Sequence, residues 1–142
     1  MSAAIPFGNF MRQADLALAS SMKHNRSLKN MEELNQSVDW NRINMILLSH
    51  YTLGTASEGA DAYPPLLLYK CLLFQKWFHI DSDPELENQI NDRISFKKFI
   101  GLSFDDPSPD HSTFSRFRKR LSKNAMDQIH PVTNYAIHFS KL

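Results

Sequence analysis

The stretch "PPLLLYKCLLFQKWF", Pro64–Phe78, carries most of the information about the fold of this chain. Its apolar residues leave little polar surface on any side, so it predicts a central buried helix. Proline is tolerated in the first turn of a helix, and the two prolines therefore mark its beginning. The stretch also contains Lys70 and Lys76 and is shorter than the ~20 residues that cross a bilayer, which indicates a soluble protein without a membrane partner.

Two further helices are predicted on the C-terminal side of this stretch. The letters "SDPE" at Ser82–Glu85 combine possible caps, a proline at the first helical position and acids in the first turn, which together indicate a helix start. A shorter helix is expected to begin with Ser95 as its cap and to end at Gly101. The residues expected on the inner faces of these two helices are Leu86, Ile90, Ile94, Phe96, Phe99 and Ile100.

The N-terminal side divides into a polar segment and one more helix. Residues 1–37 are weakly patterned, with at best short helices at Gln13–Met22 and Met31–Gln36, and are expected to form an arm or a loosely docked lead-in. Asp39 is a plausible N-cap for the helix that follows it. The apolar stripe of that helix is Trp40, Ile43, Leu47 and Tyr51.

A last helical stretch, about Asn124–Phe139, contains Pro131, which is expected to kink the helix or restart it. No window of the sequence alternates convincingly between apolar and polar residues, and we find no internal repeats. The fold class expected from these patterns is therefore all-α, a multi-helix bundle.

Composition narrows the possible functions without naming one. The chain of 142 residues is 42% apolar and 11% aromatic, which is enough for one folded domain with a real core. Its 16 Lys and Arg nearly balance 15 Asp and Glu, so net charge alone does not indicate a nucleic-acid-binding protein. Cys71 is the single cysteine and lies in an apolar run, which predicts a buried, inert thiol in a cytoplasmic protein.

A basic helix is predicted in "PDHSTFSRFRKRL", Pro109–Leu121, with Asp110 or Ser108 as its cap. At about 100° per residue, three apolar side chains fall within roughly 60° of one another and predict a buried face. They are Phe114, Phe117 and Leu121. The bases that cluster on the opposite side, with Ser112 among them, are Arg116, Lys119, Arg120 and Lys123.

Arg118 is the exception among these bases, because the helical wheel places it beside Phe114 and Leu121. A base on this inward edge needs a partner, which the acid-rich segment Asp81–Asp92 or Asp110 would supply. We therefore expect Arg118 to form a structural ion pair and exclude it from the candidate DNA contacts.

The outward bases admit two interpretations. Phosphate contact is the functional one, supported by hydroxyl side chains near a helix N-terminus. A solvated cationic face without a ligand is the alternative, and the pattern by itself leaves both open. The candidate DNA contacts are Ser112, Thr113, Ser115, Arg116, Lys119, Arg120 and Lys123.

No complete active site is predicted. The order Asp110, His111, Ser112 has the lettering of a hydrolytic triad, but adjacent helical side chains point about 100° apart and cannot line up as acid, base and nucleophile. Asp105, Asp106 and Asp110 would suit a hard cation, although acids before a helix are usually caps. The six histidines form no HExxH pair and have no cysteine partners, so we expect neither catalytic nor metal-binding residues.

Several blocks of the sequence carry a resemblance to a known family. They are "PPLLLYKCLLFQKW" (64–77), "SDPELENQINDRISFKKFIGL" (82–102) and "PDHSTFSRFRKRL" (109–121), and "VDWNRI" at Val38–Ile43 fits the family's lead-in. In this order and spacing they resemble the N-terminal domain of bacterial insertion-sequence transposases of the InsH type. The similarity covers about Val38–Lys123, which is well over half of the chain.

The resemblance implies a helical domain, residues 38–123, with a helix-turn-helix-like segment that binds the terminal inverted repeats of double-stranded DNA. Self-association, or association with full-length transposase, is also expected, in the bacterial cytoplasm at the nucleoid. The segment Gly101–Asp110 is longer than the turn of about 3–4 residues in a standard helix-turn-helix.

In this family a catalytic domain follows, which uses three carboxylates and a divalent metal to cut and join DNA strands. Residues 124–142 are similar to the family's linker helix, and the sequence ends before the strand that would carry the first catalytic aspartate. We therefore expect no catalytic residue, no cofactor and no enzymatic activity in this chain alone. An alternative expectation is a helical protein–protein interaction module that assembles with full-length transposase or inhibits it, motivated by the apolar excess of Leu66–Phe78.

Overall fold

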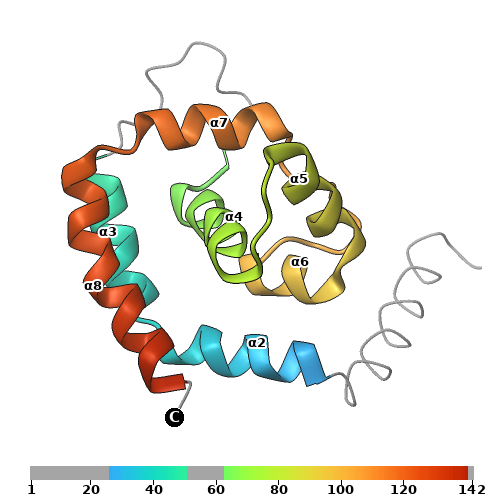
Figure 1. Cartoon of the computed structure of the whole chain (residues 1–142), viewed down its shortest axis with the longest axis horizontal. Coiled ribbons are helices and arrows are strands. Elements are labelled where there is room, and N and C mark those ends of the chain that lie inside the picture. The colour runs from blue at the N-terminus through green and yellow to red at the C-terminus, as the bar shows by residue number, and fades with distance from the viewer. Residues whose placement is uncertain (1–25, 51–62, 141–142) are drawn as a thin grey trace, which may run out of the picture.

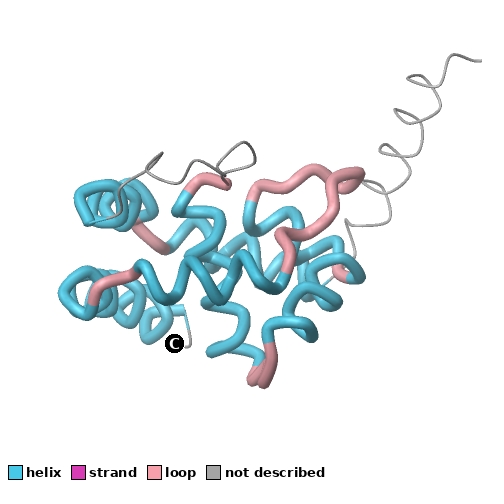
Figure 2. Tube along the Cα trace, turned by 90° about the horizontal axis from the view of Figure 1, so that it is seen from above, coloured by secondary structure: helices cyan, strands magenta, loops and turns pink. Residues whose placement is uncertain are grey.

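The computed structural model describes residues 26–50 and 63–140, with backbone alone for residues 27 and 134–140. Within these ranges the chain forms seven helices and no strand, which confirms the all-α prediction. Figure 2 shows these helices joined by loops. The helices are α2 (Arg26–Ser37), α3 (Trp40–His50), α4 (Pro65–Phe78), α5 (Asp83–Asp92), α6 (Ile94–Ile100), α7 (His111–Arg120) and α8 (Lys123–Ser140).

Helix α4 lies in the middle of the bundle, as its apolar sequence predicts (Figure 1). Helix α7 crosses one end of the bundle in this view and α2 the other, α3 and α8 pack side by side, and α5 and α6 close the remaining side. Phe74 is fully buried and stacks on Phe96 with 4.0 Å between ring centroids. Burial of one such side chain contributes roughly 1.5–3 kcal/mol, so this aromatic contact joins α4 firmly to α6.

The helix ends follow local sequence signals in most places. The Arg42 backbone N–H donates to Asp39 Oδ1 over 3.1 Å, and the Glu85 N–H donates to Ser82 Oγ over 3.2 Å, so both predicted caps are confirmed. Gly101 ends α6 in the left-handed conformation, at φ 80°. Each of these devices satisfies backbone groups that the first or last helical turn leaves without a partner.

The prediction that Ser95 caps the following helix is wrong. Helix α6 begins at Ile94, and Arg93 occupies the cap position without a side-chain hydrogen bond. The same Arg93 also ends α5, so the two helices share one extended residue and leave no room for a separate cap. Ile94, expected on the inner face of the preceding helix, is therefore the half-buried first residue of α6.

Part of the expected N-terminal arm is a docked helix. Helix α2 packs against α6 and α8, and its Leu28 and Met31 are only 5% and 6% exposed. The expected helix Met31–Gln36 lies within it, whereas Gln13–Met22 lies outside the described residues. The sequence pattern predicts a shorter helix than α2 because few apolar residues attach α2 to the bundle. Polar contacts provide the remaining attachment.

Helix α8 continues through Pro131 instead of restarting there. Proline has no N–H to donate to the carbonyl four residues earlier, so tertiary contacts must offset that loss. The Tyr69 and Thr133 hydroxyls are 3.1 Å apart and join α8 to α4 just beyond the proline. Fully buried Ala125 and Ile129 hold the preceding turns against the core.

Candidate nucleic-acid interface

Helix α7 is anchored to the bundle by two aromatic side chains. Phe114 is 0% and Phe117 2% exposed, and Leu121 is half-buried at the C-terminal end, which is the inner face that the helical wheel predicts. Of the two predicted cap residues, Asp110 is the one used, because its Oδ2 accepts the Ser112 N–H over 3.1 Å. Ser108 is buried instead, with its hydroxyl donating to the Pro109 carbonyl.

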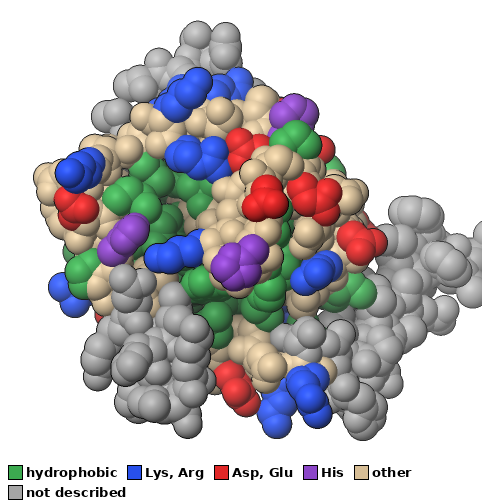
Figure 3. All heavy atoms as spheres, in the orientation of Figure 1, with side chains coloured by type: hydrophobic (Ala, Val, Ile, Leu, Met, Phe, Trp, Pro, Cys, Tyr) green, Lys and Arg blue, Asp and Glu red, His purple; other side chains and the backbone are tan. Residues whose placement is uncertain are grey.

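The opposite side of α7 carries a set of exposed cations, which we call the basic face. Its members come from α7 and the first residue of α8, and α7 itself contains no acidic residue. Figure 3 shows Lys and Arg side chains over α7 at the upper edge of the molecule, and acidic side chains over α5 to the right. The basic face consists of Arg116, Lys119, Arg120 and Lys123, all exposed.

The hydroxyl residues of α7 are less available than the bases. The Ser112 hydroxyl donates to Asp110 Oδ2, and the side chains of Thr113 and Ser115 are half-buried. The Thr113 hydroxyl also accepts a long hydrogen bond, 3.5 Å, from Arg116 Nη2. The Ser112 and Thr113 hydroxyls therefore already have hydrogen-bond partners within this segment, and Ser115 is partly covered.

Carboxylates occupy the N-terminus of α7, where an anion would otherwise bind. The His111 N–H donates to Glu87 Oε1 over 2.8 Å, while Asp110 accepts the next N–H. The hydrogen bonds from Ser112, first from its side chain and then from its backbone, lower the pKa of Asp110 below its usual range. A phosphate at this end would meet two negative charges, so the C-terminal half of α7 is the more favourable place for one.

Three side chains of the kinds that bind metal ions lie close together at the same end of α7. His111 Nδ1 lies 3.4 Å from Glu87 Oε1 and 3.3 Å from Asp110 Oδ1. Among the described residues, Asp110 thus groups with these two side chains and not with Asp105 or Asp106. Because both carboxylates already accept hydrogen bonds from the first turn of α7, we assign them to capping.

Arg118 binds the acid-rich segment that its position on the wheel points to. Its Nη2 lies 2.9 Å from Asp83 Oδ1 and its Nη1 lies 3.2 Å from Asp83 Oδ2. Gln75 completes the contact, since its Oε1 accepts from Arg118 Nη2 over 2.6 Å. Sequence reasoning named Asp83 only as one of the acids of the segment Asp81–Asp92, without choosing among them, and did not name Gln75.

The connection between α6 and α7 is held by polar groups that sequence reasoning missed. Lys97 Nζ donates to the carbonyls of Phe104 and Asp106 over 3.0 and 2.7 Å. The Ser108 N–H donates to Asn91 Oδ1 over 2.8 Å, which attaches the loop to α5. A lysine inside the apolar pattern "FKKFI" was the available signal, and Lys97 is only 8% exposed.

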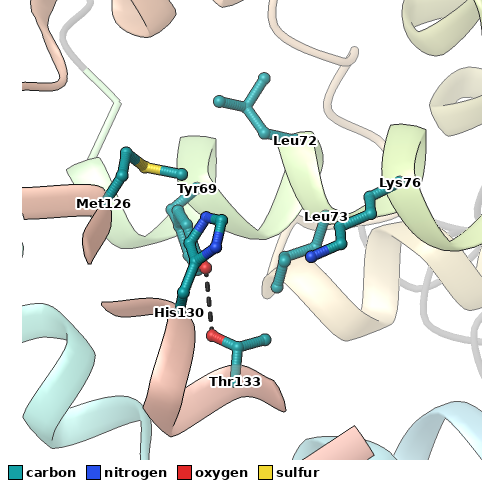
Figure 4. A pocket seen from close by; sticks show the side chains of 7 residues that line it. All are labelled: Tyr69, Leu72, Leu73, Lys76, Met126, His130 and Thr133. Carbon is teal, nitrogen blue, oxygen red and sulfur yellow. Dashed lines mark hydrogen bonds between the residues drawn. The ribbon is translucent and has the colours of Figure 1, made fainter. Parts of the chain in front are cut away.

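A cavity of about 190 Å³ lies between α4 and α8, and none of the residues that line it belongs to the basic face. Figure 4 shows the hydroxyls of Tyr69 and Thr133 bonded to each other beside it, with Lys76 and His130 among its lining residues. A small-molecule site needs several polar groups that converge on the ligand. The two hydroxyls here satisfy each other, so the cavity does not compete with α7 as a functional site.

The comparison with protein families decides the identity of the domain. The sequence model of a family described as "Transposase domain (DUF772)" matches residues 17–120, well over half of the chain. The chain belongs to this transposase domain family. No solved structure matches it.

The matched range places the secondary structure within the transposase domain. It contains α2 through α7 and ends at Arg120, the last residue of α7. It begins before Val38, so the similarity extends over α2 as well as over the blocks recognised in the sequence. No described helix of the transposase domain is both long and apolar enough to span a bilayer.

Proposed function

We propose that this transposase domain binds double-stranded DNA through the basic face of α7, and that its target is the terminal inverted repeat of an insertion sequence of the InsH type. The observation that carries the proposal is the separation of roles on one short helix. Phe114 and Phe117 hold α7 in the core, while the cations of the basic face are exposed and α7 itself carries no acid. Any surface helix has an apolar and a polar face, but packing alone does not require the charges of the polar face to be cations only.

The charge distribution favours one end of α7. Asp110 and Glu87 occupy its N-terminus, whereas Arg116, Lys119 and Lys123 lie on its C-terminal half and just beyond. Phosphate contacts position a protein on DNA, and each one contributes about 0.9 to the slope of log affinity against log salt concentration. The proposed contact is therefore with the DNA backbone, made by the C-terminal half of the basic face.

A salt series with two duplexes tests the proposal. The purified chain is titrated with a terminal inverted-repeat duplex and with a scrambled duplex of the same composition. We expect tighter binding to the repeat, and affinities that fall as salt rises with a slope of about −2 to −4 for a handful of phosphate contacts. Equal affinity for both duplexes would refute recognition of the inverted repeat by this chain, and binding that is insensitive to salt would refute phosphate contact through the basic face.

Self-association through α3 is the second candidate function. The apolar residues of α4 that motivated a protein–protein module are buried or half-buried, apart from Phe78, which is 41% exposed. Helix α3, by contrast, exposes Met45 at 72% and Leu48 at 47%, one turn apart on one side. If these residues pair two copies, Met45→Glu lowers the sedimenting mass of the chain; a monomeric wild type contradicts this candidate.

The proposal assigns binding, and not strand cleavage, to the described residues. In the family that the sequence resembles, three carboxylates and a divalent metal belong to a separate catalytic domain. Metal-dependent nuclease activity of the purified chain that is lost on Asp105→Ala or Asp110→Ala would contradict this assignment. The same preparation serves for the duplex titrations, so binding and cleavage are measured side by side.

A further inference from the structure

We propose that Gln75, Asp83 and Arg118 form a positioning clamp that sets the rotation of α7 and withholds Arg118 from DNA. This inference rests on the proposed DNA binding by the basic face. Each member of the clamp comes from a different helix, Gln75 from α4, Asp83 from α5 and Arg118 from α7. The clamp makes Arg118 a positioning residue in a helix whose Arg116 and Lys119 are exposed to solvent on the opposite side.

The three side chains form a closed ring of hydrogen bonds. Arg118 donates to both oxygens of Asp83, at 2.9 and 3.2 Å, and to Gln75 Oε1 at 2.6 Å. Gln75 Nε2 donates in turn to Asp83 Oδ1 over 2.8 Å. An amide can accept from the guanidinium and donate to the carboxylate at once, whereas ionised glutamate only accepts and lysine only donates, so glutamine suits this position better than either.

The geometry ties the basic face to the bundle on a second side. Phe114 and Phe117 anchor one edge of α7, and Arg118 is attached next to them by two hydrogen bonds to one carboxylate. Adjacent helical positions diverge by about 100°, so this fixes the directions of Arg116 and Lys119 as well. A planar guanidinium bound through two bonds resists rotation more than a single contact does.

The clamp also keeps Arg118 out of the proposed set of DNA contacts. The Arg118 side chain is 45% exposed, so a phosphate is able to reach it, but Asp83 is only 20% exposed and holds it from the protein side. To bind Arg118, a phosphate would have to displace the Asp83 carboxylate, which accepts two hydrogen bonds from it, and the Gln75 amide. Because phosphate contacts carry no sequence information, withholding this one limits non-specific binding.

The test replaces Asp83 with asparagine and uses Asp92→Asn as the matched control. Both changes remove one negative charge from the same acid-rich segment, and no described residue pairs with Asp92. We expect Asp83→Asn to release Arg118, to raise affinity for the scrambled duplex about two- to fivefold, and to steepen the salt slope by about 0.9. Asp92→Asn should leave the salt slope unchanged, and only Asp83→Asn should narrow the preference for the inverted repeat.

A second substitution identifies the released group. Arg118→Gln alone should leave the wild-type salt slope unchanged, and in the Asp83→Asn background it should restore that slope. A wild-type slope in folded Asp83→Asn, or a shallower slope in Arg118→Gln alone, would overturn the clamp. Absence of salt-dependent DNA binding by the wild-type chain would instead overturn the proposed function, so the two failures are distinguishable.

Discussion

Lys70 Nζ of α4 lies 3.1 Å from Asn35 Oδ1 of α2, and the same nitrogen donates to the Phe99 carbonyl of α6. It also stands 4.4 Å from the centre of the Trp40 ring. No described carboxylate pairs with this cation, and burial lowers the pKa of Lys70 below its usual value. One buried ammonium group thus gathers contacts from α2, α3 and α6 around α4.

Removal of this cation should loosen α2 more than the rest of the bundle. Lys70→Met keeps the apolar stem but leaves two acceptors without their donor, so we expect a loss of about 1–3 kcal/mol in the free energy of unfolding. Hydrogen exchange should accelerate first at the amides of α2. Urea unfolding checks the magnitude, and the exposed lysine Lys76 of the same helix, changed to Met, serves as the control.

Charge changes on α7 should separate binding from stability. Arg116→Glu is expected to weaken affinity for the inverted repeat while the melting temperature stays nearly the same, because Arg116 is exposed and makes only a long contact to Thr113. Arg118→Ala should lower the free energy of unfolding by about 1 kcal/mol, since it leaves Asp83 without its guanidinium. The reverse pattern in melting and titration experiments would show that the two faces of α7 are wrongly assigned.

The ion pair between Arg118 of α7 and Asp83 of α5 should also affect how the stability of the chain changes at acidic pH. The pKa of Asp83 is lowered from its ordinary value of 3.8, chiefly because Arg118 donates hydrogen bonds to it. Its contribution to folding is therefore complete well above that value, and is lost as pH falls through the lower folded-state pKa. Urea midpoints between pH 6 and pH 2 should fall more steeply for the wild type than for Asp83→Asn.

Two left-handed residues should respond to substitution in opposite directions. Gly101 has φ 80° with no atom within 4 Å of an added Cβ, so Gly101→Ala should destabilise by about 1 kcal/mol through backbone strain alone. His79 ends α4 at φ 54° although it carries a Cβ, and His79→Gly should therefore stabilise slightly, by about 0.5 kcal/mol. Thermal unfolding of both variants measures the difference, and equal signs would contradict this explanation.

The sequence by itself determined the elements whose signals are local. The apolar run of α4, the caps at Asp39 and Ser82, the stop at Gly101 and the inner aromatics of α7 all depend on residues within a turn or two of one another. Backbone geometry converts such spacing directly into helix ends and buried faces. The family blocks were readable for the same reason, since they are continuous stretches of chain.

Only the tertiary structure decided which distant polar groups meet. The partner of Arg118 is 35 positions away at Asp83 and 43 positions away at Gln75, and Lys70 finds Asn35 across 35 positions. A helical wheel shows that Arg118 lies on the inward edge of α7 and needs a partner, but the sequence offers several acids and does not distinguish among them. The choice among them depends on how the helices pack, because hydrogen bonds discriminate over tenths of an ångström.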